Sequence, residues 1–297
     1  MNFEKSLCDI SGLTVLRNEE LSSHCGYGVG GKADFFALPT DVEQLKAVVE
    51  LCETYGVNYK TLGNGTNVLF SDSGYRGVIV SLKNLDDVYF EGDNVVSLCG
   101  TNLEKLISFA IIHDLSGLEK LSGIPATVGG AVVMNAGAFG VSVSDCLCCA
   151  EVLRNGKIIR LNKDECGFGY RKSNFQKSGA IIISAAFKLQ KGERFHINSD
   201  YKLCSVLRKN IQPQGRCCGS VFKNSEKVAA GKIIEMCGLK GYGYGGAYVS
   251  DKHANFIMTK HGAKAGDVYY LIKYVKEKVY HDFGVLLSEE IEYVGDF

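Results

Sequence analysis

The residues with the clearest chemical potential lie in a glycine-rich stretch, residues 122–140, which reads SGIPATVGGAVVMNAGAFG. The stretch has no charged side chain, and its glycines and alanines are too small to fill a core. Glycine permits positive φ and lets backbone N–H groups come close to a ligand, while Ile124-Pro125 favours an extended entry. We therefore predict a backbone cradle for something large, flat and anionic. A structural loop folded under the domain is the alternative.

A second candidate for anion binding is residues 63–67, Gly-Asn-Gly-Thr-Asn, which follow a short apolar run. A loop of this composition directly after a strand presents N–H and hydroxyl donors in a small concavity suited to phosphate. A plain turn is the alternative, because Gly and Asn are also common turn residues.

Two further glycine patterns have the spacing of dinucleotide-binding motifs but the wrong context. Residues 24–32, HCGYGVGGK, contain G-x-G-x-x-G, and residues 241–246 repeat that spacing. A dinucleotide fingerprint must open a helix, whereas residues 33–39 look like a strand. Ala33 also stands where a P-loop needs Ser or Thr for its metal ion. We assign neither pattern to a nucleotide.

Length and composition indicate a cytoplasmic protein of about two domains. The 297 residues include 33 Lys+Arg and 33 Asp+Glu, so nothing suggests binding to nucleic acid or to an anionic membrane. The N-terminus lacks a signal-peptide pattern, and the twelve cysteines are expected to be reduced and buried. The cluster Cys146, Cys148 and Cys149 has no second set of ligands, so no metal site is predicted.

Sequence patterns also predict the elements that position these loops. Residues 40–43 and 101–104 look like capping boxes that begin two helices, and Asp267 is expected to cap a third. An Asn-Gly pair at 155–156 between apolar runs predicts a hairpin, and residues 283–294 predict a closing strand. Helices and strands mixed along the chain favour an α+β protein.

Seven segments follow one another along the chain: LGNGTNVLFSDSGYRG, SGIPATVGGAVVMNAGAFG, FGYRKS, GSVFKN, AGKIIEMCGLKG, VSDKHANF and GVLLSEEIEYVG. In this order they resemble the UDP-N-acetylenolpyruvoylglucosamine reductases, flavoenzymes of peptidoglycan precursor synthesis. The resemblance covers about residues 24–295, nearly the whole chain. Each segment alone is a weak signal, but seven in the family's order are hard to reach by chance. The short connection between FGYRKS and GSVFKN resembles the compact type of the family, which lacks a longer insertion.

The resemblance implies an α+β fold with a two-lobed FAD-binding domain of the vanillyl-alcohol-oxidase (PCMH) type and a C-terminal α/β substrate domain. The FAD-binding domain would occupy residues 1–192, with lobes at about 1–82 and 83–192, and the substrate domain residues 193–297. The last strand is expected to pack back on the FAD domain. The protein would be a monomer or a weak oligomer without a nucleic-acid or membrane partner.

The resemblance also implies two cofactors, FAD and NADPH. In the family NADPH reduces FAD and leaves, and UDP-N-acetylglucosamine enolpyruvate takes its place and is reduced to UDP-N-acetylmuramate. The two glycine-rich loops match the family's FAD-binding loops, and neither contains a His or Cys for covalent attachment. The residues expected to bind FAD non-covalently are Gly63, Asn64, Gly65, Thr66, Asn67, Gly123, Ile124, Pro125, Ala126, Val128, Gly129, Gly130, Asn135, Gly137 and Ala138.

The resemblance assigns catalysis to Arg171, Ser220 and Glu290. Hydride addition to the enolpyruvyl group builds negative charge on its carboxylate, and each fixed donor aimed at such charge is typically worth ~3–4 kcal/mol. The planar guanidinium of Arg171 suits bidentate contact with a carboxylate. Glu290 matches a glutamate near the same group, and Ser220 matches the serine that donates the proton. Glu289 is the rival of Glu290, and because neighbours on a strand point to opposite faces, register decides between them.

Other positions match the family's substrate contacts or depart from its pattern. Tyr170, Lys223 and Asn224 fit contacts to the sugar or its phosphates. Asn64 and Ala126 stand where many members have glycine, which matters wherever the backbone must be left-handed.

Two alternatives from other classes stay open. One is another FAD-dependent oxidoreductase of the same superfamily that acts on a different substrate; the C-terminal segments argue against it. The other is a flavin-free UDP-sugar binding or regulatory protein that has kept the fold. A purified protein without flavin bands would favour the second.

Overall fold

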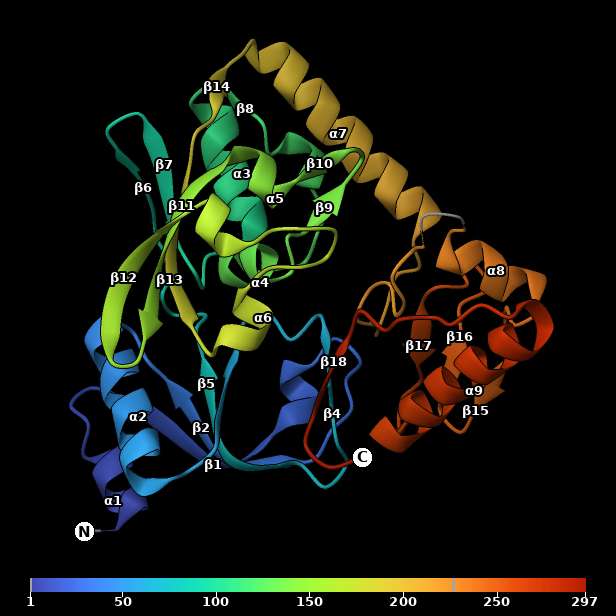
Figure 1. Cartoon of the computed structure of the whole chain (residues 1–297), viewed down its shortest axis with the longest axis horizontal. Helices are drawn as coiled ribbons and strands as arrows, with labels where there is room; N and C mark the ends of the chain where they lie inside the picture. Colours follow the sequence, from blue (N-terminus) through green and yellow to red (C-terminus); the bar gives the residue numbers. More distant parts are fainter. Residues whose placement is uncertain (1, 226–227) are drawn as a thin grey trace. The chain divides into compact units, whose positions relative to one another are not determined.

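The computed structural model describes residues 2–225 and 228–297, and the chain forms two compact units (Figure 1). Unit 1 comprises Met1–Leu16, Phe35–Asn64 and Val78–Arg208. Unit 2 comprises Arg17–Asp34, Gly65–Gly77 and Lys209–Phe297. The division into domains at 192/193 stays a prediction.

Unit 1 contains most of the strands, three of which extend into unit 2. They are β1 (Thr14–Glu20), β2 (Lys32–Leu38), β3 (Tyr59–Leu62), β5 (Tyr75–Ser81), β6 (Val88–Glu91), β7 (Asn94–Leu98), β8 (Leu115–Ser116), β9 (Gly137–Ala138), β10 (Val141–Ser142), β11 (Leu147–Arg154), β12 (Lys157–Asn162), β13 (Ile181–Phe187) and β14 (Gln190–Lys191). One sheet has the order β1-β2-β5-β3, with β3 and β5 parallel. A second sheet, β12-β11-β13-β7-β6, is antiparallel throughout.

The predicted hairpin is confirmed. Asn155 and Gly156 join β11 to β12, and both have positive φ, 51° and 70°. A two-residue type I′ turn requires this conformation at both positions, which is why Asn-Gly is its usual sequence.

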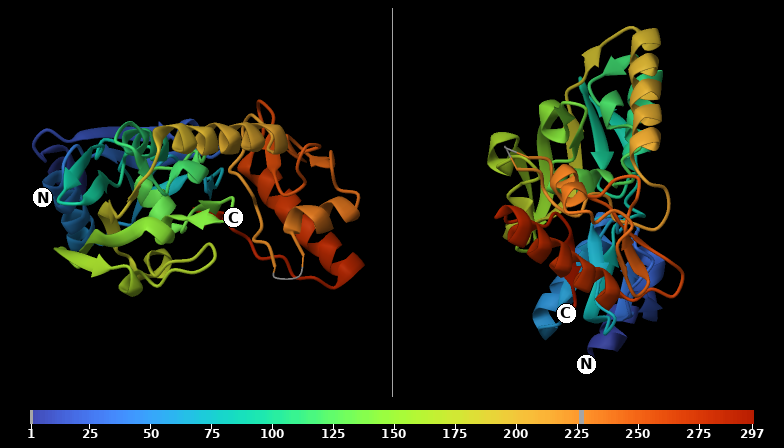
Figure 2. Two further views of the ribbon diagram at one scale, coloured as in Figure 1. Left: turned by 90° about the horizontal axis from the view of Figure 1, so that it is seen from above. Right: turned by 90° about the vertical axis from the view of Figure 1, so that its right-hand side faces the viewer.

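The helices of unit 1 are α1 (Phe3–Cys8), α2 (Val42–Tyr55), α3 (Leu103–Ile112), α4 (Val128–Val133), α5 (Val143–Cys146), α6 (Phe175–Ser178) and most of α7 (Arg194–Ile211), with 3-10 turns η2 (Glu119–Leu121) and η3 (Asp164–Cys166). Figure 2 shows α7 as one continuous helix. The short helix α4 lies inside the glycine-rich stretch and packs on β7 and β13. This packing fixes the stretch to the second sheet.

Both predicted capping boxes were wrong by one residue. Asp41, not Thr40, is the N-cap of α2, and its carboxylate accepts an N–H of the first turn at 2.8 Å. Asn102, not Thr101, is the N-cap of α3. Thr101 is buried and its hydroxyl donates to the carbonyl of Asp87 at 3.0 Å, so it has no part in the cap. Asp and Asn cap at least as well as Thr, so the helices begin at the next residue.

Unit 2 contains η1 (Leu21–His24), β4 (Val68–Phe70), α8 (Ala230–Met236), β15 (Gly243–Tyr244), β16 (Ala247–Val249), β17 (Ile257–Thr259), α9 (Ala265–Phe283) and β18 (Glu292–Val294). The long helix α9 packs on α8, β15 and β16 through a fully buried face that includes Val268, Leu271, Ile272, Val275 and Val279. The last strand, β18, pairs in parallel with β4. Unit 2 therefore has a core of its own, separate from the core cluster of unit 1.

Asp267 takes part in the cap of α9 as predicted, but not from the N-cap position. The helix begins at Ala265 after the N-cap Lys264, and Asp267 lies in its first turn. The Asp267 carboxylate accepts the backbone N–H of Lys264 at 3.0 Å and that of Gly246 at 2.9 Å. It therefore closes a capping box from the inside of the helix.

The predicted closing strand is much shorter than residues 283–294. Only Glu292–Val294 is a strand, because α9 continues to Phe283 and ends at Gly284 in the left-handed conformation. In the described segment between Gly284 and β18, one isolated bridge forms, between Glu289 and Phe222.

The chain passes between the two units five times. Three passages lie inside β1, β2 and β5, one lies between Asn64 and Gly65, and one lies inside α7. Across the described residues, no helix is long and apolar enough to cross a membrane.

Candidate active site

Unit 1 brings the start of the first loop against the second loop. The amide nitrogen of Asn64 donates to the carbonyl of Pro125 at 3.2 Å. A Cβ added to Gly63 would clash with the hydroxyl of Thr127. The two stretches that the sequence predicted as parts of one site, about sixty residues apart, are therefore in direct contact.

The two departures from the family's glycines fit this geometry. Asn64 and Ala126 do not have positive φ, whereas Gly65 and Gly123 of the same loops do, with 67° and 75°. A side chain at either position therefore costs no backbone strain.

Several N–H groups of the second loop already have protein acceptors. The N–H of Gly123 donates to Glu104 at 3.0 Å, that of Val128 to Thr101 and that of Gly129 to Cys99, both at 2.8 Å. These donors are engaged inside unit 1. The sequence predicted that the glycines would offer a ligand both close approach and free N–H donors. These N–H groups are not free, so close approach of the backbone is what remains.

Adjacent glycines of the second loop differ in their surroundings. A Cβ on Gly129 would lie 2.9 Å from the Cβ of Cys99 and 3.1 Å from its carbonyl oxygen, so packing excludes a side chain there. Gly130 is exposed, has no positive φ, and its added Cβ would meet only the Thr127 hydroxyl at 3.4 Å. Neither packing nor backbone conformation in unit 1 requires glycine at position 130. Space for a ligand is the physical reason that remains for a glycine there.

Arg171 lies on a tight turn beside the second loop. Two backbone hydrogen bonds between Gly169 and Lys172, at 3.0 and 3.2 Å, close the turn. Arg171 has φ 52°, a conformation uncommon for a residue with a side chain. Its Nη2 donates to the carbonyl of Gly137 at 2.8 Å. The turn thus holds the guanidinium half-buried against a residue of the predicted FAD loop.

The turn and the loop are joined by Asn135, which is buried. Its amide nitrogen donates to the carbonyl of Gly169 at 3.0 Å, and its amide oxygen accepts the N–H of Ser144 at 3.0 Å. The side chain of Asn135 therefore positions the Arg171 turn, and its predicted contact with FAD stays a prediction. Tyr170, next to Arg171 on the turn, is exposed, as a residue that contacts a substrate must be before binding.

Unit 2 brings Ser220, Glu290 and Asn67 together. The backbone N–H of Glu290 donates to the carbonyl of Val221 at 2.7 Å, one residue after Ser220. The amide nitrogen of Asn67, in the second half of the first loop, donates to the carbonyl of Glu290 at 3.1 Å. Two predicted catalytic residues and one predicted FAD residue thus share one hydrogen-bonded neighbourhood. The sequence separations of 70 and 223 residues gave no sign of it.

Glu289, the rival of Glu290, has a charged partner in unit 2. The carboxylate of Glu289 pairs with the ammonium group of Lys276 at 2.8 Å, and burial and the charge of Glu289 raise the pKa of Tyr293. Glu289 therefore belongs to an ion pair with α9, and the choice of Glu290 over Glu289 stays a prediction.

The remaining predicted residues of unit 2 have structural contacts as well. The backbone N–H of Lys223 donates to the carbonyl of Ser288 at 2.8 Å. The side-chain oxygen of Asn224 accepts the N–H of Ala230 at 2.9 Å, at the start of α8. Both positions are thereby fixed beside the Ser220 segment, and their contacts with substrate stay predictions.

A pair of thiols lies behind the first loop. The thiols of Cys25 and Cys218 both donate to the carbonyl of Val68, at 3.2 and 3.3 Å. A hydrogen bond from Cys218 lowers the pKa of Cys25, whereas burial raises the pKa of Cys218. Gly26 donates its N–H to the carbonyl of Gly65 at 2.8 Å. The stretch that contains Cys25 thus supports Gly65 of the first loop.

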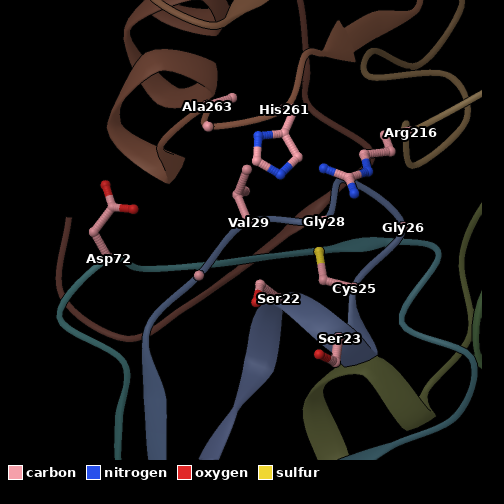
Figure 3. A pocket seen from close by; sticks show the side chains of 12 residues that line it. Ser22, Ser23, Cys25, Gly26, Gly28, Val29, Asp72, Arg216, His261 and Ala263 are labelled. Atoms are coloured by element: carbon pink, nitrogen blue, oxygen red, sulfur yellow. The ribbon is translucent and has the colours of Figure 1, made fainter.

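Unit 2 also has a polar pocket of about 540 Å³ that sequence reasoning missed. Figure 3 shows it lined by residues of the segment 22–30, but not His24 or Tyr27, together with Asp72, Arg216, His261 and Ala263. The rejected G-x-G-x-x-G pattern forms one wall. The Asp72 carboxylate is engaged by the first N–H groups of α9, at 2.8 Å each. In the part of the chain that the structure describes, no cluster of three or more His, Cys, Asp or Glu could hold a metal ion.

Comparison with known proteins decides the family. A profile described as the C-terminal domain of UDP-N-acetylenolpyruvoylglucosamine reductase matches residues 212–294, and one described as an FAD binding domain matches residues 33–162. A UDP-N-acetylenolpyruvoylglucosamine reductase from Clostridium novyi is 41% identical over 284 residues, which is 95% of this chain and 92% of that relative. The chain belongs to the UDP-N-acetylenolpyruvoylglucosamine reductase family.

Other relatives of the family agree. The UDP-N-acetylenolpyruvoylglucosamine reductase of Geobacillus kaustophilus is 39% identical, with 95% of this chain and 93% of the relative covered. The crystal structure of the reductase from Thermus caldophilus matches with a TM-score of 0.83 and 33% identity over 95% of this chain and 99% of that chain. A more distant structure, an alkyldihydroxyacetonephosphate synthase, matches at a TM-score of 0.50 over 64% of this chain and 40% of that chain, and shows the fold alone.

As a member of this family the protein is an FAD-dependent oxidoreductase, with an FAD-binding domain of the vanillyl-alcohol-oxidase type and the reductase family's C-terminal domain. The predictions of family, fold class and FAD are confirmed. The residues present fit the cofactor, because Gly130 leaves open a place on the second loop that a side chain would fill.

Proposed function

We propose that this protein catalyses the NADPH-dependent reduction of UDP-N-acetylglucosamine enolpyruvate to UDP-N-acetylmuramate, in peptidoglycan precursor synthesis in the cytoplasm. The observation that carries the proposal is the match to the family over nearly the whole chain, including both domains. FAD, when bound, supplies the hydride chemistry between NADPH and the substrate. Residues of both glycine-rich loops would hold it, with Gly130 allowing close approach.

Arg171 is proposed to bind the carboxylate of the enolpyruvyl group. Its Nη2 bond to the Gly137 carbonyl, at 2.8 Å, fixes the guanidinium in place before substrate arrives. A preorganised cation stabilises the negative charge that develops on the carboxylate without having to reorganise during the reaction. Tyr170 on the same turn is proposed to contact the sugar or its phosphates.

Ser220 is proposed to give a proton from its hydroxyl to the carbon next to that carboxylate. A serine hydroxyl is a weak acid, so the step depends on a strongly basic acceptor and on accurate placement. The hydrogen bond from Glu290 to the Val221 carbonyl supports that placement. The Glu290 carboxyl is proposed to lie beside the same substrate group, and Lys223 and Asn224 to contact the phosphates or the sugar.

The proposal is tested by the visible spectrum of the anaerobic protein, with NADPH added first and the enolpyruvyl UDP-sugar second. We expect flavin bands that bleach with NADPH and return only with the sugar. Bands that bleach and are restored only by oxygen would leave the FAD assignment intact and refute the substrate. A protein that reacts with NADH and not with NADPH would refute the reductant alone.

Adjacent glutamates give a matched pair of variants. Glu290→Gln should leave flavin bleaching by NADPH unchanged and slow the return of the bands with the sugar about 100-fold or more, a typical loss for one active-site group. Glu289→Gln removes an equal charge that is paired with Lys276 and should keep both half-reactions. Equal losses in both variants would contradict the role of Glu290. Ser220→Ala should resemble Glu290→Gln.

A further inference from the structure

Asn255 is a buried polar residue whose side chain pairs with the backbone of the Ser220 segment, residues 219–224. The residue is 3% exposed. Its amide oxygen accepts the N–H of Phe222 at 2.9 Å, and its amide nitrogen donates to the carbonyl of the same residue at 2.8 Å. Two opposite residues of an antiparallel strand pair exchange the same two bonds. The Asn255 side chain thus takes the place of a strand neighbour for Phe222.

The backbone around Asn255 holds the same segment. The carbonyl of Asn255 accepts the N–H of Val221 at 2.9 Å, and Phe256 forms an isolated antiparallel bridge with Ser220. On the other side of the segment, the carbonyl of Val221 accepts the N–H of Glu290 at 2.7 Å. The two proposed catalytic residues, Ser220 and Glu290, are therefore joined through backbone that Asn255 holds.

The pairing with Phe222 requires a carboxamide at position 255. Buried N–H and carbonyl groups need partners, because without one they have lost their hydrogen bonds to water and gained nothing. Val221 and Phe222 are buried, so solvent does not reach them to replace the Asn255 amide. The side chain must present an acceptor and a donor side by side. Asn does so at every pH, whereas an ionised carboxylate of the same shape only accepts.

We propose that Asn255 is a positioning residue for the proton donor Ser220. The inference rests on the proposed function, in which the Ser220 hydroxyl gives a proton to carbon. Such a weak acid depends on accurate placement, and a shift of about 1 Å can cost on the order of 100-fold in rate. Ser220 is half-buried, and the two residues after it are fixed by Asn255 on one side and by residues 288–290 on the other. Asn255 acts through this backbone and not on the substrate.

The test compares Asn255→Asp with Asn255→Leu and with a control, Thr259→Val. Asn255→Asp keeps the shape and the acceptor for the Phe222 N–H, but its second oxygen faces the Phe222 carbonyl and donates only when protonated. Asn255→Leu offers neither group at any pH. Thr259 is also buried in unit 2, and its hydroxyl donates to the carbonyl of Tyr27. Thr259→Val therefore removes a buried hydrogen bond that does not involve the Ser220 segment.

The introduced carboxyl of Asn255→Asp makes the missing bond depend on pH. Burial and the Phe222 carbonyl should raise its pKa above the usual value of about 3.9, since both disfavour the ionised form. The bond is then present below that pKa and is lost as pH rises through it. The titratable neighbours are Glu289 and Glu290 across the segment and His253, whose ring accepts the N–H of Asn255 at 3.2 Å and whose pKa is lowered by burial. The wild type has all three, so their titration cancels in the ratio of variant to wild type at each pH.

The measured quantity is the rate at which saturating sugar restores the flavin bands of the reduced holoprotein, from pH 5.5 to 8.5 and well below the melting temperature. In Asn255→Asp the rate should be about 10- to 100-fold below that of the wild type at pH 8.5 and recover as pH falls. Bleaching by NADPH should stay unchanged. The sugar concentration that gives half the maximal rate should change little, because a misplaced proton donor weakens the transition state and not substrate binding. Asn255→Leu should be slow at every pH, and Thr259→Val should match the wild type.

Wild-type rates in Asn255→Asp at pH 8.5 would overturn the proposal. So would a constant rate ratio in Asn255→Asp together with a melting temperature that recovers at low pH, because the bond would then have re-formed without effect on the reaction. Equal slowing in Thr259→Val would also overturn it, since any lost hydrogen bond in the buried part of unit 2 would then have the same effect. Failure of the proposed function is seen separately, because the sugar would then not restore the flavin bands of the wild type.

Discussion

Residues 24–32 and residues 122–140 are both rich in glycine, but the glycines serve different purposes in the two segments. In residues 24–32 of unit 2, an added Cβ would lie 2.5 Å from the Cys217 carbonyl at Gly26 and 2.7 Å from the Phe70 Cβ at Gly30, and would clash with the Asp72 carbonyl at Gly31. These glycines let protein segments pack on one another.

In residues 122–140 of unit 1, packing requires glycine at some positions and not at others. Gly129 is required by packing against Cys99, whereas Gly130 and Gly140 meet no close neighbour. Glycine spacing alone therefore does not distinguish a ligand cradle from a packing site. The distinction lies in whether the protein itself fills the space that the missing Cβ leaves.

The largest effect on stability is expected at Gly31. In Gly31→Ala the new Cβ meets the backbone of Asp72 and lies 2.8 Å from the backbone nitrogen of Gly74, neither of which can rotate away. We expect a loss of at least about 3 kcal/mol in the free energy of unfolding, the upper range for overpacking, measured by denaturant titration. Gly266→Ala is the control in the same unit, because its Cβ would meet only the Asp72 side chain at 3.4 Å. Equal stability of the two variants would break the packing explanation.

The next effect separates neighbours in the second loop. Gly129→Ala should lower the free energy of unfolding by about 2 kcal/mol, because the Cβ meets Cys99. Gly130→Ala should raise it by about 0.5–1 kcal/mol, because alanine favours the helical backbone. Affinity for FAD should fall in Gly130→Ala although the protein is more stable. A stable Gly130→Ala with normal FAD affinity would remove the evidence that this position faces the cofactor.

Arg171 provides the converse case, a side chain where the backbone favours glycine. Arg171→Gly and Arg171→Ala both remove the guanidinium and should lose sugar-dependent turnover about 100-fold or more. Their stabilities should differ, with Arg171→Gly more stable by about 1 kcal/mol, because only alanine keeps a Cβ at φ 52°. Thermal unfolding of both variants measures the difference. Equal melting temperatures would show that the turn relaxes once the Gly137 contact is gone.

The smallest effect concerns the thiols behind the first loop. Alkylation proceeds through the thiolate, so the lowered pKa of Cys25 should give it a pH midpoint below 9.0, with the rate rising as pH rises through that midpoint. Cys218 is buried with a raised pKa and should stay unmodified. Mass spectrometry of Cys8→Ser, which removes an exposed thiol, measures both rates, with Cys25→Ser as the control. Faster labelling of Cys218 than of Cys25 would contradict the assigned hydrogen bond.

Much of the fold, and the family with its cofactor FAD, could be predicted from sequence. The Asn-Gly hairpin was correct because two residues set its geometry locally. The family's motifs led to FAD and to the fold, since seven ordered segments carry information that no single pattern has. The predicted N-caps Thr40 and Thr101 were each one residue too early, because the adjacent Asp41 or Asn102 caps the helix instead.

What could not be predicted depends on contacts between distant segments. The hydrogen bonds of Glu290 with Val221 and Asn67 join parts of the chain that sequence spacing does not relate.

The five passages of the chain between the units have a consequence for dissecting the gene. A fragment that starts at residue 193 would encode Lys209–Phe297 of unit 2 and omit Arg17–Asp34 and Gly65–Gly77. It would lack β4, the strand on which β18 pairs, and two core residues, Tyr27 and Val29. Cutting the chain at this point therefore separates segments that fold together in unit 2. The C-terminal piece should be insoluble unless the N-terminal piece is produced with it.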